Sequence, residues 1–304
     1  MKTVLITGCN GLLGQKLVSI FLKDSNIKLI ATARGDNRMM HKSGYIYESI
    51  DITNNEEIKR IIHTYYPDTI INTAALTSAD YCEANHDDCS MINIQAVKNL
   101  VQEANHIYAQ LIHLSTDFVF SGDKGRYNES DEPGPVNYYG WSKRESEKIV
   151  EELSERWSIV RTSLVYGVYD NPTRTNLPLL VKSYLEKKKV IRVNNDQFRT
   201  PTLAEDLASG ISEIAHRDSE GYYNISGAEY ISILETANLV ADFFNLDRSL
   251  ILPVSSIELN ENAKRPLKGG LKIDRAIKEL DYSPCKLVKG LEKIKRQLSI
   301  SRTQ

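Results

Sequence analysis

The sequence predicts an α/β protein with a doubly wound parallel β-sheet, followed by a smaller mixed α/β region. Short runs rich in Val, Ile and Leu alternate with longer amphipathic stretches, a pattern typical of strands and helices over a parallel sheet. A turn with regularly spaced glycines directly follows the first of these runs. Expected strands are 2–7, 28–33, 45–50, 69–72, 110–114 and 158–161, and expected helices are 12–23, 55–65, 88–105 and 138–155.

The alternation weakens after Gly167. Residues 169–176 are rich in Asn, Pro, Thr and Arg and predict a loop, before helices over 206–216, 233–244 and 287–298. We therefore expect a first domain over 1–167 and a smaller region over 168–304, some elements of which return to the first domain.

Composition excludes several classes of protein. The 304 residues are 41% hydrophobic and 26% charged, as in an ordinary globular chain. The net charge of -2 provides no overall field that would attract nucleic acid or an anionic membrane. No apolar stretch reaches the roughly 20 residues that span a bilayer, and the first apolar run is too short for a signal peptide. A cytoplasmic protein that binds neither nucleic acid nor membrane is expected.

The four cysteines are expected to be reduced thiols, because the long chain has no secretory features. Cys82, His86 and Cys89 have a spacing that would place three potential metal ligands on one helix face. No fourth ligand lies nearby in sequence, and the polar residues between them suit a solvated helix. We predict no metal site there.

Gly8, Gly11 and Gly14 form a G-x-x-G-x-x-G turn between the first strand and the first helix. Glycine permits a tight turn and a close approach of backbone to ligand, while a helix N-terminus offers free N–H groups to a pyrophosphate. This context predicts a Rossmann-type dinucleotide-binding sheet. The expected cofactor contacts in the turn are Gly8, Asn10, Gly11, Leu12, Leu13 and Gly14.

Three later strand ends complete the predicted cofactor site. Arg34 ends the second strand, where a fold that prefers NAD would offer Asp or Glu, and its guanidinium can pair with a 2′-phosphate. The expected cofactor is therefore NADP(H), with NAD(H) as the alternative. Asp51 and Ile52 end the third strand near the expected adenine, and the small Ala74 and Ala75 leave room for a ribose.

Tyr139 and Lys143 lie four residues apart on a predicted helix and share one face. An ammonium at Lys143 would lower the pKa of Tyr139 from about 10, so that the phenol could exchange a proton with a carbonyl oxygen. Ser115 and Thr116 end a strand on the ligand side and would present a hydroxyl to the same oxygen. These residues predict a carbonyl-reducing or carbinol-oxidising site.

Together these motifs resemble the extended short-chain dehydrogenases, and most closely their dTDP-4-dehydrorhamnose reductase branch. The motifs are the glycine turn, S-T-D-F-V-F-x-G from Ser115, Y-G-x-S-K from Tyr139 and R-T-S-x-V-Y-G from Arg161. The resemblance continues in N-x-A-A from Asn72, in the segment 196–208 and in A-x-R-P from Ala263, and so covers nearly the whole chain.

The resemblance implies NADPH-dependent reduction of the C4 keto group of a nucleotide-activated deoxysugar. It implies Tyr139 as general acid, Lys143 as its electrostatic partner and Thr116 as hydrogen-bond donor to the carbonyl. It also implies a homodimer, because related enzymes often associate through helices. The expected substrate contacts are Thr116, Asp117, Phe118, Leu164, Arg199 and Arg265.

Three positions depart from the branch. Leu164 stands where the branch typically has Trp, and Arg199 and Ser146 stand where it has Gly. An added guanidinium at Arg199 could bind a substrate diphosphate or pair with a carboxylate. The chemistry is unaffected by these changes, but they leave the sugar and the nucleotide open.

Two other functions compete with the reductase. A related epimerase or dehydratase would normally retain tightly bound NAD, against which Arg34 argues. A non-catalytic regulatory subunit resembling the methionine adenosyltransferase β subunit has no need of Thr116, Tyr139 and Lys143 together.

Overall fold

The computed structural model describes residues 1–300 and has a seven-stranded parallel sheet at its centre, in the order β11-β6-β5-β4-β1-β2-β3. The chain runs outward from β1 to β3, returns to β4 on the other side of β1, and then continues to β11. This reversal confirms the predicted doubly wound fold and predicts a ligand site at the carboxyl ends of β1 and β4. The strands are β1 (Lys2–Thr7), β2 (Ile27–Ala33), β3 (Ile46–Ser49), β4 (Thr69–Asn72), β5 (Gln110–Thr116), β6 (Trp157–Thr162) and β11 (Gly221–Asn224).

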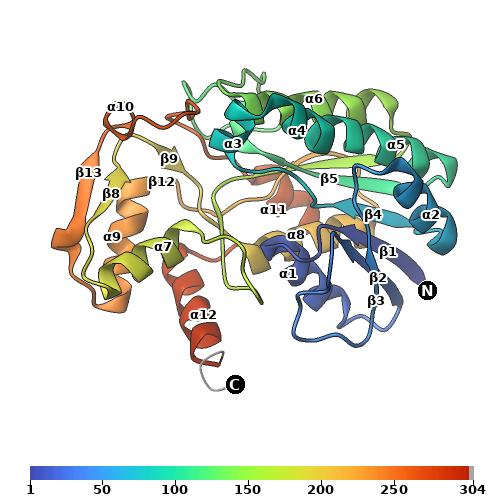
Figure 1. The fold of residues 1–304 in the computed structure, drawn as a ribbon, viewed down its shortest axis with the longest axis horizontal. Coiled ribbons are helices and arrows are strands. Elements are labelled where there is room, and N and C mark those ends of the chain that lie inside the picture. The colour runs from blue at the N-terminus through green and yellow to red at the C-terminus, as the bar shows by residue number, and fades with distance from the viewer. Residues whose placement is uncertain (301–304) are drawn as a thin grey trace.

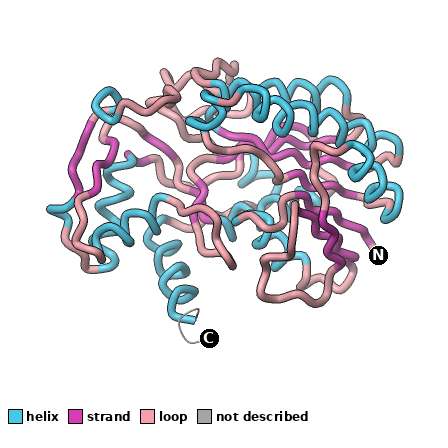
Figure 2. The backbone as a smooth tube through the Cα atoms, viewed as in Figure 1, coloured by secondary structure: helices cyan, strands magenta, loops and turns pink. Residues whose placement is uncertain are grey.

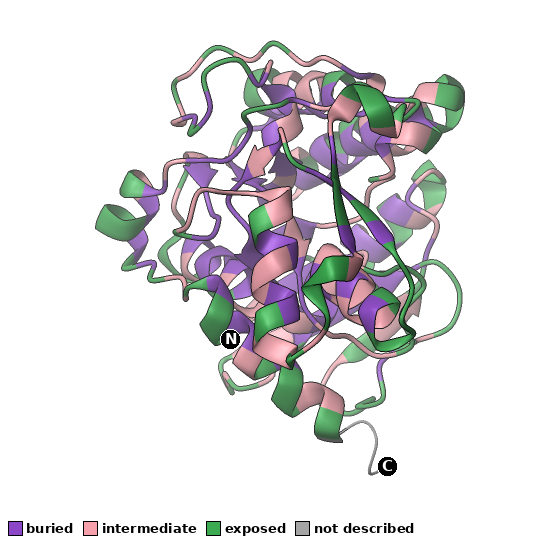
Figure 3. Ribbon diagram, turned by 90° about the vertical axis from the view of Figure 1, so that its left-hand side faces the viewer, coloured by how far each residue is buried: buried purple, intermediate pink, exposed green. Residues whose placement is uncertain are grey.

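Helices cover both faces of the sheet (Figure 1). One layer consists of α2 (Asn55–Tyr65), α5 (Ala96–His106) and α6 (Tyr138–Leu153), and the other of α1 (Leu12–Phe21), α8 (Ala204–Arg217) and α11 (Asp274–Leu280). Apolar side chains from the sheet pack against each layer and form two separate cores. Figure 3 shows buried residues along the sheet and the inner helix faces, with exposed residues outside.

The predicted helix over 88–105 is interrupted in the structure. It consists of α4 (His86–Ser90), a π-helical segment (Met91–Gln95) and α5, and is preceded by α3 (Ala79–Ala84). The π turn contains Asn93, whose buried side chain binds both the N–H and the C=O of Leu76. Since π turns are irregularities within helical sequence, the apolar periodicity did not reveal this one.

The second region packs around its own core, at the left in Figure 1 and Figure 2. Its helices are α7 (Leu177–Glu186), α9 (Ile233–Phe244), α10 (Ser256–Leu259) and α12 (Leu287–Ile300). Its paired strands are β7 (Val165–Tyr166) with β10 (Thr202–Leu203), β8 (Ile191–Asn194) with β13 (Ile251–Val254), and β9 (Phe198–Arg199) with β12 (Ile231–Ser232). Residues 165–300 thus supply this region and also α8, β11 and α11 of the sheet layers. Within residues 1–300, no helix has the length and apolarity that crossing a bilayer requires.

Candidate functional site

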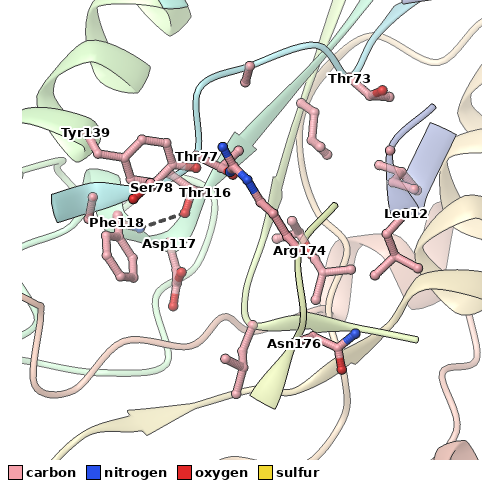
Figure 4. Close-up of a pocket in the computed structure, with 18 of the residues that line it drawn as sticks. Leu12, Thr73, Thr77, Ser78, Thr116, Asp117, Phe118, Tyr139, Arg174 and Asn176 are labelled. Carbon is pink, nitrogen blue, oxygen red and sulfur yellow. Dashed lines mark hydrogen bonds between the residues drawn. The ribbon is translucent and has the colours of Figure 1, made fainter. Parts of the chain in front are cut away.

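A cavity of about 750 Å³ lies at the carboxyl ends of β1, β4 and β5, between the sheet and the second region (Figure 4). It is the site that the sheet reversal predicts. Its lining includes most of the predicted cofactor and substrate residues: Gly8, Gly11, Leu12, Leu13, Gly14, Ala75, Thr116, Asp117, Phe118, Tyr139, Leu164, Arg199 and Arg265.

The glycine turn forms one end of this cavity. Gly8 has a positive φ of 71°, and a Cβ on Gly14 would lie 2.4 Å from the carbonyl oxygen of Gly8. Side chains at these two positions would break the turn. Gly11 precedes α1 without a side-chain cap, so the first N–H groups of the helix are left for a ligand. The cradle therefore fits a dinucleotide pyrophosphate.

Other predicted cofactor residues lie beside the cavity rather than in its lining. Asn10 is buried and holds the following loop, donating to the carbonyl of Asp36 and accepting from the N–H of Arg38. Ala74 packs against Gly8.

The side chain of Arg34 is 81% exposed, and its guanidinium lies 3.8 Å from the carboxylate of Asp51. That carboxylate also accepts hydrogen bonds from the backbone and hydroxyl of Thr53, and Ile52 is buried beside it. The free face of Arg34 is therefore available to an anion at the end of β2.

The structure brings the three predicted catalytic residues to the other end of the cavity. Tyr139 and Lys143 lie on the first two turns of α6, and the Tyr139 hydroxyl lies beside Thr116, the last residue of β5 (Figure 4). Thr116 Oγ1 also accepts from the N–H of Phe118 at 3.2 Å. The ring of Phe118 packs edge-on against Tyr139, with 5.7 Å between ring centroids.

Burial raises the pKa of Tyr139, and the hydrogen bond to Thr116 only partly opposes this effect. The net shift is therefore upward, opposite in direction to the lowering that the sequence predicts. The Lys143 ammonium lies 2.9 Å from Nε2 of His113 instead, and both side chains are buried.

His113 is a site residue that the sequence analysis missed. Burial, followed by the charge of Lys143, lowers its pKa well below the usual value, so the ring is neutral. Burial also lowers the pKa of Lys143 to about 8. His113 Nδ1 lies 3.1 Å from the amide of Asn72, which accepts from Thr7 Oγ1. The available signal was the alternation of polar His113 and Ser115 with apolar Ile112 and Leu114 along β5.

Arg199 and Asp117, both expected to contact substrate, are partners of each other. Arg199 Nε lies 3.6 Å from Asp117 Oδ2, and both side chains are almost fully buried. The same carboxylate oxygen accepts from Ser163 Oγ at 2.7 Å and from the N–H of Gly270 at 3.0 Å. Of the two roles considered for Arg199, the structure shows the carboxylate pair.

Arg265 also pairs within the protein. Its guanidinium binds both carboxylate oxygens of Asp80 and lies 3.1 Å from Glu261. The hydrogen bond from Arg265 lowers the pKa of Asp80.

Leu164 lines the cavity with a φ of 42°, an uncommon conformation for a residue with a branched side chain.

Arg174 was not predicted, although its loop was. Its side chain reaches across the cavity and donates to Thr77 Oγ1 at 2.8 Å (Figure 4). Among the cavity-lining arginines of residues 1–300, Arg174 alone has no carboxylate within ion-pair distance. No sequence pattern distinguishes it, because the neutralisation of the other two depends on contacts between distant segments.

The three potential metal ligands of the 82–89 segment do not converge. Cys82 and Cys89 are buried behind Tyr139, and Cys89 donates to Ser142 Oγ at 3.3 Å. The ring of His86 stacks on Tyr138 instead, with 3.6 Å between centroids.

Comparison with known proteins agrees with this architecture. Residues 1–300 match the model of the RmlD substrate binding domain family. The chain is 31% identical over 259 residues to methionine adenosyltransferase 2 subunit beta from Rattus norvegicus, which covers 84% of this chain and 75% of the relative. It is 33% identical over 287 residues to the spore coat polysaccharide biosynthesis protein SpsK of Bacillus subtilis (strain 168), covering 93% of each.

Solved structures give the same result. The dTDP-4-dehydrorhamnose reductase of Bacillus anthracis, solved in complex with NADP, superposes with a TM-score of 0.83 at 29% identity, covering 98% of this chain and 100% of that one. The predicted resemblance to extended short-chain dehydrogenases of the dTDP-4-dehydrorhamnose reductase branch is confirmed. The chain therefore belongs to the RmlD substrate binding domain family.

Proposed function

We propose that this protein is an NADPH-dependent reductase of the C4 keto group of a nucleotide-activated deoxysugar. The observation that carries the proposal is the Tyr139 hydroxyl, which lies beside Thr116 in the cavity that begins at the glycine turn, with the buried Lys143 one turn further along α6. The NADP-bound reductase among its structural relatives and the polysaccharide biosynthesis relative support the same chemistry.

The residues present fit the cofactor. The uncapped start of α1 and the glycine turn would hold its pyrophosphate, and the exposed Arg34 would bind a 2′-phosphate. When bound, the reduced nicotinamide supplies a hydride to the substrate carbon.

Tyr139 would provide the proton, and Tyr139 and Thr116 would stabilise the negative charge that develops on the keto oxygen. Because its pKa is raised, Tyr139 keeps its proton at neutral pH and can donate it to the keto oxygen as that oxygen gains negative charge. Thr116 would donate a second hydrogen bond to the same oxygen. The Lys143 ammonium would then stabilise the tyrosinate that remains.

Arg174 is the residue that we propose for the substrate's diphosphate. Arg199 and Arg265 are already neutralised by carboxylates, whereas the guanidinium of Arg174 has only a hydroxyl partner. A guanidinium without a carboxylate can bind phosphate oxygens through two parallel hydrogen bonds. Its position across the cavity from the glycine turn separates it from the proposed pyrophosphate site of the cofactor.

The proposed function is tested by following NADPH and NADH oxidation with a panel of 4-keto nucleotide sugars, together with the C4 configuration of the product. Turnover with at least one substrate, faster with NADPH, is expected. Faster turnover with NADH would contradict the role of Arg34. Conversion of a sugar nucleotide without net cofactor consumption would identify an epimerase or dehydratase instead.

The 31% identity to a methionine adenosyltransferase β subunit makes a regulatory role the second candidate. That role predicts no NADPH oxidation with any keto sugar nucleotide and a stable complex with a methionine adenosyltransferase catalytic subunit. The buried pairing of Tyr139 with Thr116, close to Lys143, favours the enzyme.

A further inference from the structure

A cluster of three potential metal ligands lies outside the site described above. His63 near the end of α2, and Glu103 and His106 in the last turn of α5, place their ligand atoms within 4.8 Å of one another. The two helices are neighbours in one layer (Figure 1). Both end at the edge of the sheet opposite the cavity, since they connect back to the starts of β4 and β5.

The carboxylate of Glu103 is the centre of this cluster. Its side chain is only 7% exposed, and its Oε2 lies 2.8 Å from His63 Nε2 and 3.4 Å from His106 Nδ1. Among residues 1–300, these two imidazoles are the only basic side chains within ion-pair distance of Glu103. A buried carboxylate requires such a cationic or hydrogen-bonding partner.

The geometry is close to that of a three-ligand zinc site. Zinc binds imidazole nitrogen and carboxylate oxygen at about 2.0–2.2 Å, which at a tetrahedral angle separates ligand atoms by about 3.3–3.5 Å. The two distances from Glu103, 2.8 and 3.4 Å, approach this separation. The imidazoles are 36% and 64% exposed, so they can turn toward one metal ion and leave a fourth position for water.

Electrostatics favour a cation at the same place. His63 lies in the last turn of α2, and α5 ends at His106, so the C-terminal ends of two helices contribute partial negative charge. We propose that His63, Glu103 and His106 form a binding site for Zn²⁺ that ties these helix ends together. The site is independent of the proposed reductase activity.

The test is a titration of the full chain, freed of any affinity tag and stripped by a chelator, with ZnCl₂ in a calorimeter. One Zn²⁺ per chain is expected, together with a rise in Tm, because a ligand that binds only the folded state stabilises it. His63→Asn and His106→Asn should each weaken binding by at least the roughly 10–100-fold that loss of an outer-shell partner costs. Both should abolish the rise in Tm.

His41→Asn is the matched control, since His41 is exposed on another loop and its side chain hydrogen-bonds only Ser43 within the described chain. It should bind Zn²⁺ like the wild type. Absence of stoichiometric binding in the wild type would overturn the proposal. An unchanged affinity for Zn²⁺ in the double variant His63→Asn/His106→Asn would also overturn it, because the metal would then be bound by thiols. Replacing Zn²⁺ by Co²⁺ gives an independent result, because thiolate ligands add an intense near-ultraviolet band that this N/O site lacks.

Discussion

Lys143 Nζ lies 2.9 Å from Nε2 of His113, and neither side chain is accessible to solvent. Because Asn72 Oδ1 accepts from Thr7, the amide nitrogen of Asn72 faces His113 Nδ1, which must accept. The ring proton therefore lies on Nε2, where Ser146 Oγ at 3.1 Å can accept it. Nε2 thus offers no lone pair to the Lys143 ammonium, whose pKa burial lowers to about 8. His113 is a positioning residue between Asn72 and Lys143.

Turnover should decrease as the pH rises through about 8, because burial lowers the pKa of Lys143 to about 8 and only its ammonium form can stabilise a tyrosinate. Below that pH the lysine is charged and the rate should be constant on this limb. The dependence of kcat on pH, measured between about pH 6 and pH 10, tests this prediction. A rate that stays constant throughout would contradict the role of the Lys143 charge.

Arg174→Ala should raise KM for the nucleotide sugar by about 10–100-fold, the equivalent of a lost charge-assisted hydrogen bond, with little change in the Kd of NADPH. Arg174→Lys keeps the charge but not the planar fork, and its KM should fall between the two. Steady-state kinetics and cofactor fluorescence titration measure the two quantities. A weakened NADPH complex with unchanged KM would instead assign Arg174 to the cofactor's pyrophosphate.

Glu147→Ala should destabilise the fold by about 3–5 kcal/mol, because it leaves a buried guanidinium unpaired. Glu147 accepts two hydrogen bonds from Arg161, at 2.9 and 2.8 Å, and one from Ser115 Oγ at 2.6 Å, all fully shielded. Arg248→Ala, which removes an exposed ion pair, is the control and should change stability little. Urea denaturation distinguishes the two, and equal effects would refute the importance of the buried pair.

Most of the sheet could be predicted because its information is local. Apolar runs such as 2–7 and the turn at Gly8 appear in the sequence as strand and glycine signals, and the order of the elements predicts a doubly wound topology. The π turn around Asn93 was missed because its cause is a contact with Leu76, which lies 17 residues earlier.

In the candidate site, too, the residues that lie close together in sequence could be predicted, whereas the contacts between distant segments could not. Tyr139 and Lys143 share one helix, so their spacing revealed them, whereas the contact between Lys143 and His113 joins α6 to β5. The neutralisation of Arg199 by Asp117 also depends on segments far apart in sequence. Charge pairing across a cavity decides which arginine remains for a ligand, and only the folded chain shows it.

The central claim is that Tyr139 supplies the proton to a keto sugar. Its most direct test is the NADPH-oxidation rate of Tyr139→Phe, in which the ring remains and the hydroxyl beside Thr116 is lost. General acid catalysis typically contributes about 10²–10⁴-fold, so kcat should decrease by this factor while the Kd of NADPH stays unchanged. A variant that turns over at the wild-type rate would contradict the account.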